Sequence, residues 1–179
     1  MAKIAVFVGS LQEGSFNKKL AKNLEILVPE GVEFNYVDIN LPLFNQDLEA
    51  DFPAAAQAAK DIVEAADGVL FVTPEYNRSI PGVLKNAIDW TSRPWGSNSF
   101  AGKPAGIVGA SPSPVGTAVA QGDLRHIAAY LGTKLLGQPE VYLANAHEHF
   151  DEKGTIVDSS KELLQDYIDT FSAWVENEK

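Results

Sequence analysis

Short apolar runs alternate with stretches of helical spacing along the whole chain. The first run, residues 3–9 (KIAVFVG), is almost unbroken in its apolar character, as expected of a strand buried on both faces of a parallel sheet. Ser15 then begins a stretch in which apolar side chains recur at helical spacing, and Pro29 and Gly31 end it. The chain therefore begins with a strand followed by a helix.

The same alternation continues to the end of the chain. Apolar runs predict further strands over residues 32–39, 69–73, 104–109 and 135–143. Helices are predicted over residues 53–66, 81–91, 117–131 and 159–177, and residues 41–52 read as a loop. The pattern thus predicts five strands and five helices.

Strict alternation of strand and helix predicts an α/β fold, a three-layer sandwich in which helices cover both faces of one parallel sheet. Two strand orders are common for such sheets, and five strands in a chain of 179 residues suit the order 2-1-3-4-5. We expect residues 1–179 to form a single domain. Ligands of such sheets bind beyond the carboxyl ends of the strands, where the winding reverses between strands one and three.

Composition narrows the chemistry. The chain has no cysteine, which excludes disulfides, thiolate metal sites and a cysteine nucleophile. A formal net charge of −10 without clustered Lys and Arg argues against nucleic-acid or anionic-membrane binding. The apolar run at the amino terminus is too short for a signal peptide or a membrane span, so we expect a cytoplasmic protein.

The loop after the first strand, GSLQEGSFN (9 to 17), has the composition of a phosphate site. Backbone N–H groups and the positive end of the helix dipole receive an anion, and Ser10, Ser15 and Asn17 add neutral hydrogen bonds. The alternative is that Ser15 only caps the helix. A P-loop is excluded because Ser15 and Phe16 stand where it needs Lys and Ser or Thr, and no G-x-G-x-x-G fingerprint is present.

Two further loops reach the same edge of the predicted sheet. TPEYN (73 to 77) places an aromatic ring between a carboxylate and an amide, which suits a flat heteroaromatic ligand, although Tyr76 and Asn77 are equally compatible with packing and turn roles. The third loop, residues 109–116, is rich in small residues and ends at a helix start. A phosphoacceptor domain of this sheet order would carry acidic residues after strands one and three, where this chain has Gly9-Ser10 and Thr73-Pro74. We therefore do not expect a phosphoacceptor domain.

These loops, with TPEYNRSIPGVLKNAIDW (73 to 90), AGKP (101 to 104) and GASPSPVGTAVAQGDLR (109 to 125), resemble the NAD(P)H-dependent FMN reductase family over nearly the whole chain. That family has a flavodoxin-like fold and includes quinone, chromate and azo-dye reductases. The resemblance implies FMN as cofactor, NADPH or NADH as electron donor, and a homodimer or homotetramer. It places one group of residues around the FMN phosphate and ring: Ser10, Gln12, Ser15, Phe16, Asn17, Pro74, Glu75, Tyr76, Asn77 and Ser111.

The chain departs from the family pattern in two loops. The family commonly has Arg where this chain has Gln12, so a charge-assisted phosphate contact becomes a neutral one. Pro112 and Pro114 replace residues that in the family tend to be glycine. Weaker FMN binding is the expected consequence of the first departure.

The function expected from this resemblance is ping-pong transfer of electrons from NAD(P)H through FMN to a quinone, a flavin or a similar small acceptor. No catalytic side chain is needed, because the flavin carries the hydride chemistry. Arg78 is the first candidate for a substrate contact, ahead of Lys85, Arg93, Lys103 and Arg125. His147 and His149 lack a third ligand, so no metal site is expected.

Two alternatives remain open at this point. A flavodoxin-type electron carrier would use the same fold and cofactor without turnover of NAD(P)H. A relative that has lost flavin would bind only a nucleotide or a partner protein.

Overall fold

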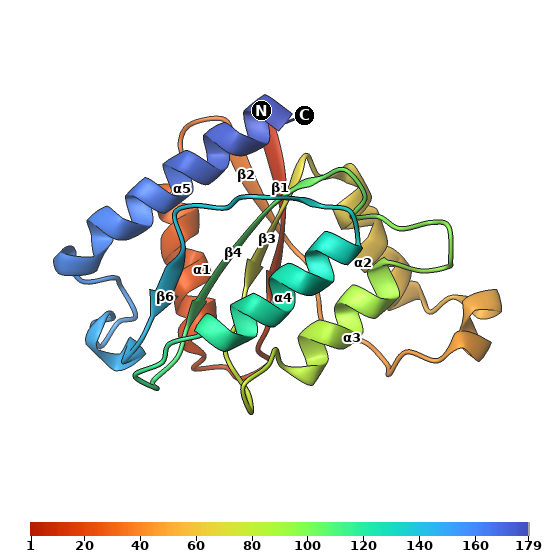
Figure 1. Cartoon of the computed structure of the whole chain (residues 1–179), viewed down its shortest axis with the longest axis horizontal. Coiled ribbons are helices and arrows are strands. Elements are labelled where there is room, and N and C mark those ends of the chain that lie inside the picture. Colours follow the sequence, from red (N-terminus) through yellow and green to blue (C-terminus); the bar gives the residue numbers. More distant parts are fainter. Residues whose placement is uncertain (179) are drawn as a thin grey trace.

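The computed structural model describes residues 1–178, and within them one twisted sheet forms the centre of the molecule (Figure 1). The first four strands are β1 (Ala2–Val8), β2 (Val32–Tyr36), β3 (Gly68–Val72) and β4 (Pro104–Ala110). Two short strands follow, β5 (Lys134–Leu135) and β6 (Val141–Leu143). All pairings are parallel and run in the order β2-β1-β3-β4-β5, with β6 also on β4. The predicted strand order is confirmed.

Helices cover both faces of this sheet, as the alternating pattern predicts. The helices α1 (Phe16–Leu27) and α5 (Asp158–Glu178) pack on one face and share a core with the inward side chains of β1, β3 and β4. On the other face lie α2 (Ala54–Ala65), α3 (Gly82–Thr91) and α4 (Ala118–Tyr130), which bury a second core. Each apolar run of the sheet therefore faces helices on both sides, because its alternate side chains feed different cores.

The predicted fifth strand over residues 135–143 is wrong in one respect. It divides into β5 and β6, which pair with the beginning and the end of β4 respectively. Pro139, preceded by Gly137, lies in the middle of this stretch, and proline has no N–H to donate to a ladder. The side chain of Arg125 holds the detour, donating to the carbonyl of Leu136 at 3.0 Å and facing the carboxylate of Glu140 at 3.4 Å.

Two smaller differences concern the segment that follows β2. The strand ends at Tyr36 and not at Ile39, and the predicted loop over residues 41–52 contains a 3₁₀ helix, Gln46–Asp51. Asn45 caps this short helix by accepting from the N–H of Asp47 at 3.1 Å. No helix among the described residues is both long and apolar enough to cross a membrane.

The loops that follow β1, β3 and β4 meet at one edge of the sheet, the lower edge in Figure 1. β1 and β3 are direct neighbours there, and the chain reverses its winding between them. This is where an open α/β sheet binds its ligand.

Candidate active site

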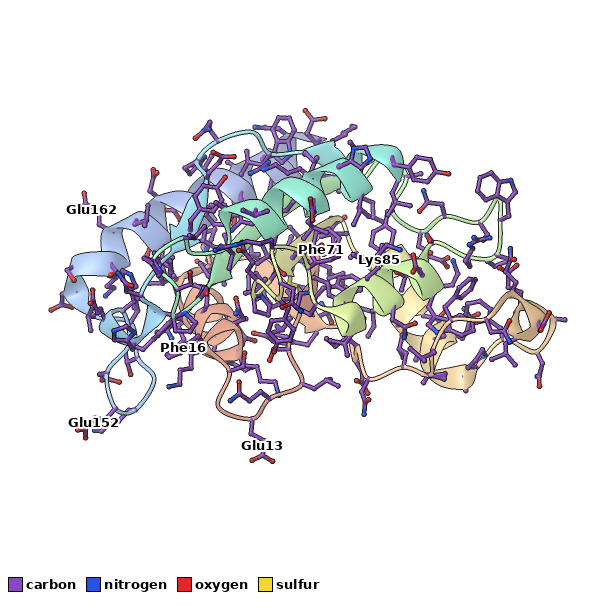
Figure 2. All side chains as sticks on the ribbon, turned by 60° about the horizontal axis from the view of Figure 1, so that its bottom comes forward. Glu13, Phe16, Phe71, Lys85, Glu152 and Glu162 are labelled. Atoms are coloured by element: carbon purple, nitrogen blue, oxygen red, sulfur yellow. The ribbon has the colours of Figure 1, made fainter. Side chains whose placement is uncertain are left out.

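The loop after β1, residues 9–15, leads into the open N-terminus of α1. Ser15 is the N-cap, and its Oγ accepts from the N–H of Asn17 at 3.2 Å. The first turn of α1 holds no acidic residue, and the exposed side chain of Glu13 points away from the body of the molecule (Figure 2). The remaining N–H groups of the first turn and the helix dipole are therefore available to an anion.

Two other residues of this loop differ in their surroundings. Ser10 is buried, and its Oγ accepts from the N–H of Gln12 at 3.3 Å. Gln12 itself is exposed on the outside of the loop. The hydroxyl of Ser10 still has a proton to donate, so it remains a candidate phosphate contact.

Asn17 ties the first loop to the third one. Its Nδ2 donates to the carbonyl of Ala110 at 2.8 Å, and its Oδ1 accepts from the N–H of Ala110 at 2.9 Å. The side chain is buried, and both ends of its amide are used in this pair. The expected contact of Asn17 with phosphate stays a prediction, while its structural role in joining two loops is plain.

Phe16 turns its ring toward the carboxyl-terminal part of the chain. The ring stacks on Phe150 with 6.1 Å between centroids, and the ammonium of Lys19 lies 5.4 Å from its centroid. Phe16 is half-buried by these contacts. Its backbone N–H, at the first position of α1, is the part of the residue that faces the phosphate loop.

The loop after β3 is a tight turn built on two residues with positive φ. The N–H of Tyr76 donates to the carbonyl of Ser79 at 2.9 Å, and the reverse bond is 3.0 Å long. Between them Asn77 has a φ of 51° and Arg78 a φ of 65°. This is the geometry of a type I′ turn, which asparagine tolerates and arginine rarely adopts. The turn holds the side chain of Tyr76 exposed beside it.

Glu75 caps the N-terminus of a different helix. One carboxylate oxygen accepts from the N–H groups of Val119 and Ala120 at 3.1 Å each, in the first turn of α4. The other accepts from Nη1 of Arg78 at 2.9 Å. The side chain of Glu75 is only 6% exposed, against 62% for Arg78. Thus α4 receives its anion from the protein itself, whereas the N-terminus of α1 does not.

The loop after β4 lies against both of the others. Its buried Ser111 donates its N–H to the carbonyl of Leu143 at 2.9 Å, and its Oγ accepts from the N–H of Ser113 at 3.2 Å. At Gly109 a Cβ would collide with the carbonyl of Thr73 and the side chain of Thr117. Only glycine allows the ends of β3 and β4 and the start of α4 to approach this closely.

Between the second and third loops lies an open hollow of about 290 Å³. The structure brings together three of the expected site residues here, with Arg78 beside them; the lining residues are Glu75, Asn77, Arg78, Ser111 and Ser113. Ser113 was missed in the sequence, although the repeated hydroxyls of the SPSP segment signal it. Pro74 is buried, and a Cβ at Gly9 would lie 3.1 Å from its Cδ, so it joins the first loop to the second.

The other candidate cations have partners elsewhere. Lys85 pairs with Asp89 at 2.8 Å, and Arg93 pairs with Glu49 at 3.4 Å. Lys103 donates to the carbonyl of Ala66 at 2.6 Å, and burial lowers its pKa from the ordinary value. None of these three residues lines the hollow between the second and third loops. Arg78 is the cation that does so.

The two histidines near the third loop have separate surroundings. His147 is exposed and lies 3.8 Å from the carboxylate of Glu148. The ring of His149 instead lies 2.7 Å from Oγ of Ser160 and 2.9 Å from the carbonyl of Ala144. Within residues 1–178 no three His, Cys, Asp or Glu side chains gather into a metal site.

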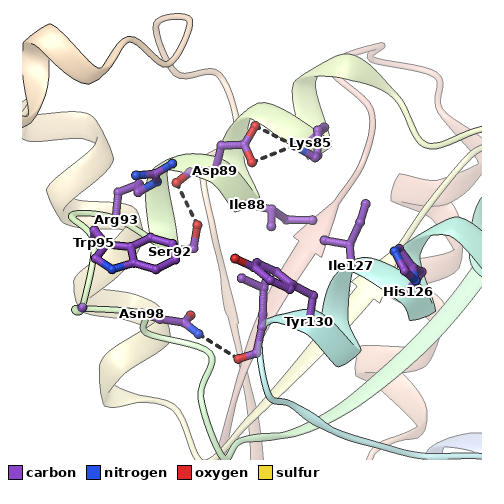
Figure 3. A pocket seen from close by; sticks show the side chains of 12 residues that line it. Lys85, Ile88, Asp89, Ser92, Arg93, Trp95, Asn98, His126, Ile127 and Tyr130 are labelled. Atoms are coloured by element: carbon purple, nitrogen blue, oxygen red, sulfur yellow. Dashed lines mark hydrogen bonds and ion pairs between the residues drawn. The ribbon is translucent and has the colours of Figure 1, made fainter.

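A larger hollow, of about 690 Å³, lies between α3 and α4 (Figure 3). Ile88 and Ile127 lie between the two helices, and Trp95 and Tyr130 border it with 78% and 74% of their surface exposed. None of the residues that line it also lines the hollow between the second and third loops. This hollow is therefore separate from the edge where the three loops meet.

The donor set at the sheet edge fits a flavin mononucleotide. The start of α1, which is capped by a neutral serine and holds no acidic side chain, offers N–H groups and the Ser10 and Ser15 hydroxyls to a phosphate. The polar hollow offers amide, hydroxyl and guanidinium groups to the edge of a ring. With a sheet of order 2-1-3-4-5, this arrangement defines a mononucleotide-binding protein of the flavodoxin-like class.

Comparisons with known proteins identify the family within this class. The model of the family described as NADPH-dependent FMN reductase matches residues 2–148. A 2-hydroxy-1,4-benzoquinone reductase from Burkholderia sp is 50% identical over 179 residues, covering 99% of this chain and 98% of the relative. A quinone reductase from Pseudomonas putida is 41% identical over 174 residues, covering 96% and 94% of the two chains.

The solved structures agree. The flavoenzyme FerB, an NAD(P)H:(acceptor) oxidoreductase from Paracoccus denitrificans, superposes with a TM-score of 0.94 at 42% identity and covers 99% of each chain. A WrbA-like flavodoxin from Agrobacterium tumefaciens, 18% identical with a TM-score of 0.68, shares the fold. The chain belongs to the NADPH-dependent FMN reductase family, and it is an oxidoreductase that uses FMN with NAD(P)H as donor.

Proposed function

We propose that this enzyme reduces a quinone-type acceptor in a ping-pong cycle, with donor and acceptor using the same open face of the cofactor in turn. Bound FMN would supply the redox chemistry, by which a hydride from NAD(P)H and one proton from solvent together reduce a quinone to a hydroquinone. The names of the similar proteins, a benzoquinone reductase and a quinone reductase, support this acceptor class.

The observation that carries the proposal is the contrast between two helix starts at one sheet edge. The carboxylate of Glu75 occupies the N-terminus of α4, whereas the N-terminus of α1 carries no acidic side chain and faces the phosphate loop. An acidic protein can therefore hold one phosphate at a single, local position. The ring end of the ligand then points to the hollow lined by Asn77, Arg78 and Ser111.

The side chains of the chain itself bind and orient. In the proposed complex Ser10 and Ser15 donate to phosphate, Asn77 and Ser111 contact the ring edge, and Arg78 contacts the diphosphate of the donor. Arg78 is suited to the last task because its guanidinium is mostly exposed, while Glu75 holds one of its nitrogens. The open hollow leaves room for a second flat molecule against the ring.

Steady-state kinetics of the FMN-loaded enzyme test the cycle. With NADH or NADPH and 1,4-benzoquinone varied together, a ping-pong cycle gives parallel double-reciprocal lines. Intersecting lines would contradict the shared face. An FMN-loaded protein that oxidises neither donor in the presence of quinone would favour the electron carrier, and a protein that binds no FMN would favour the relative that has lost flavin.

We also propose that a second copy of the chain covers the hollow between α3 and α4. The family resemblance implies dimers or tetramers, and exposed aromatic side chains such as Trp95 and Tyr130 are enriched in interface cores. Sedimentation velocity tests this: wild-type protein should sediment as a dimer or larger, and Tyr130→Lys should shift it toward monomer. A monomeric wild type at micromolar concentration would contradict the proposal.

A further inference from the structure

The segment that connects β6 to α5, residues 144–157, contacts both halves of the FMN site. We call it the tie segment. It contains the 3₁₀ turn Ala146–Glu148, and Glu152 lies at its exposed tip (Figure 2). One of its sides faces α1, and the other faces the loop after β4. A segment in this position can set how the phosphate helix and the ring-edge loop lie relative to each other.

On its first side the tie segment is fastened to α1. Asn23 of this helix donates through Nδ2 to the carbonyl of Gly154 at 2.9 Å, and its Oδ1 accepts from the N–H of Ile156 at 2.8 Å. The ring of Phe150 stacks on Phe16, the first residue of α1. Asn23 and Ile156 are both buried, so water does not compete easily for these bonds. The tie segment is therefore fixed on the helix whose N-terminus is offered to the phosphate.

On its second side the tie segment holds the loop after β4. The N–H of Ala146 donates to the carbonyl of Ser111 at 3.0 Å, and the N–H of Asn145 donates to the carbonyl of Ser113 at 3.2 Å. Both serines line the hollow to which the proposed function assigns the flavin ring. Asn145 has a φ of 49°, a left-handed conformation that the contacts around it must hold. The position of the ring-edge loop thus depends on residues 145 and 146.

His149 fixes the start of the tie segment through both nitrogens of its ring. Nε2 lies 2.9 Å from the carbonyl oxygen of Ala144, and Nδ1 lies 2.7 Å from Oγ of Ser160, in the first turn of α5. A carbonyl oxygen can only accept, so Nε2 carries the proton and Nδ1 accepts from the serine hydroxyl. Ser160 is buried, and α5 packs on β4. The neutral imidazole therefore connects the tie segment to a helix that is fixed on the sheet.

We propose that His149 is a positioning residue for the flavin ring. By donating to Ala144 it holds the adjoining residues 145 and 146, whose N–H groups fix the carbonyls of Ser111 and Ser113. His149 does not line the hollow, so its effect reaches the ring through this loop. The inference rests on the proposed function, in which Ser111 contacts the ring edge.

Two substitutions separate the hydrogen bond to Ala144 from the rest of the imidazole. The amide nitrogen of glutamine reaches the place of Nε2, whereas that of asparagine reaches only the place of Nδ1. His149→Asn should therefore weaken FMN binding about tenfold and change the visible absorption spectrum of the bound flavin, and His149→Gln should restore both. His147→Asn is the matched control, because this histidine is exposed and faces Glu148 at 3.8 Å. Fluorescence titration gives the affinities.

Hydrogen exchange of the FMN-free protein tests the same contacts without cofactor. In His149→Asn the amide hydrogens of Asn145 and Ala146 should exchange about tenfold faster than in the wild type, because local opening becomes easier. In His149→Gln they should exchange at nearly the wild-type rate. The amides of β3, a fully buried strand, are the internal control.

The proposal fails if the flavin and the histidine prove independent. Unchanged FMN affinity and spectrum in His149→Asn would show that the ring does not depend on His149. Equal losses in His149→Asn and His149→Gln would show that the bond to Ala144 is not the cause. Faster exchange without any change in the bound flavin would reduce His149 to a purely structural residue.

Quinone turnover separates this inference from the proposed function. If the wild type reduces benzoquinone with parallel double-reciprocal lines while the flavin of His149→Asn is unchanged, the proposed function stands and the positioning role is wrong. If the variants behave as expected but the wild type does not reduce benzoquinone, the role of His149 stands and the quinone cycle fails on its own.

Discussion

Asn17 shows how much one side chain contributes to the shape of the site. Its amide makes two hydrogen bonds to the backbone of Ala110, a residue 93 positions away in sequence. Because these bonds are buried, losing them leaves a backbone N–H and a carbonyl without partners. The phosphate loop and the loop after β4 therefore keep their relative position before any ligand binds.

Removing this amide should lower stability. We expect Asn17→Ala to reduce the free energy of unfolding by about 2–6 kcal/mol, from two unsatisfied buried groups at about 1–3 kcal/mol each. Urea unfolding of the FMN-free protein measures this, with Asn40→Ala, at an exposed loop position, as control. A loss no larger than that of the control would mean that water replaces the amide.

Gln12 stands where the family commonly has arginine, and its exposed position leaves space for a longer side chain. Gln12→Arg should tighten FMN binding by about 1–2 kcal/mol and make it more sensitive to salt, because a charge-assisted hydrogen bond replaces a neutral one. Quenching of FMN fluorescence on binding measures both effects. Gln57→Arg, on the exposed face of α2, controls for net charge, and equal affinities for the two variants would argue against a phosphate at this loop.

Among the elements, the turn after β3 combines strain with exposed charge. Asn77 and Arg78 both have positive φ, and a non-glycine residue in this region costs roughly 1 kcal/mol. The turn is kept in place by its two backbone bonds and by the carboxylate of Glu75 at the start of α4. The strained backbone of this turn is therefore stabilised both by hydrogen bonds within the turn and by contacts to the start of α4.

Replacing Arg78 separates its backbone role from its side-chain role. Arg78→Gly should keep or raise the free energy of unfolding, since glycine adopts positive φ freely, while KM for NADH and NADPH rises about tenfold through loss of a phosphate contact. Arg78→Ala should raise KM equally but lower stability. Thermal unfolding measures the stability of the two variants, and initial rates measure their KM for NADH and NADPH. An unchanged KM in both variants would show that Arg78 does not contact the donor.

The elements show what the sequence can and cannot reveal. The strand 3–9, the Ser15 cap and the loops at the sheet edge follow from local patterns of apolar runs, hydroxyls and glycines. The division of the last strand had a local signal in Pro139 that the apolar run masked. No local sequence signal indicates the partners of Asn17 and Glu75. Ala110 and Val119 are distant from them in sequence and contact these side chains only in the folded chain. The ligand contacts themselves stay predictions.

At the scale of the whole molecule, α5 closes one face of the sheet by packing directly on β4. A Cβ at Gly106, in the middle of β4, would lie 2.5 Å from the hydroxyl oxygen of Tyr167 and 2.7 Å from the ring of Phe171. Both side chains are fully buried. The distance between helix and sheet is thus set by the missing side chain of one glycine.

Gly106→Ala should therefore destabilise the fold by about 1–3 kcal/mol, as overpacking of a dense core does. Gly122→Ala is the matched control: a Cβ there meets nothing within 4 Å, and the substitution should stabilise α4 by about 0.5–1 kcal/mol. Chemical denaturation of both variants measures the difference. Equal stabilities would show that α5 moves outward at little cost.

The divided edge of the sheet has a consequence for the behaviour of the chain in concentrated solution. An exposed strand edge is a template on which other chains add and aggregate, and long flat edges are the dangerous ones. Here one edge is interrupted between Leu135 and Val141, and at the other β2 is five residues long with the exposed charge of Glu33. Neither edge offers a long apolar ladder, so the parallel sheet resists the growth of fibres while it folds.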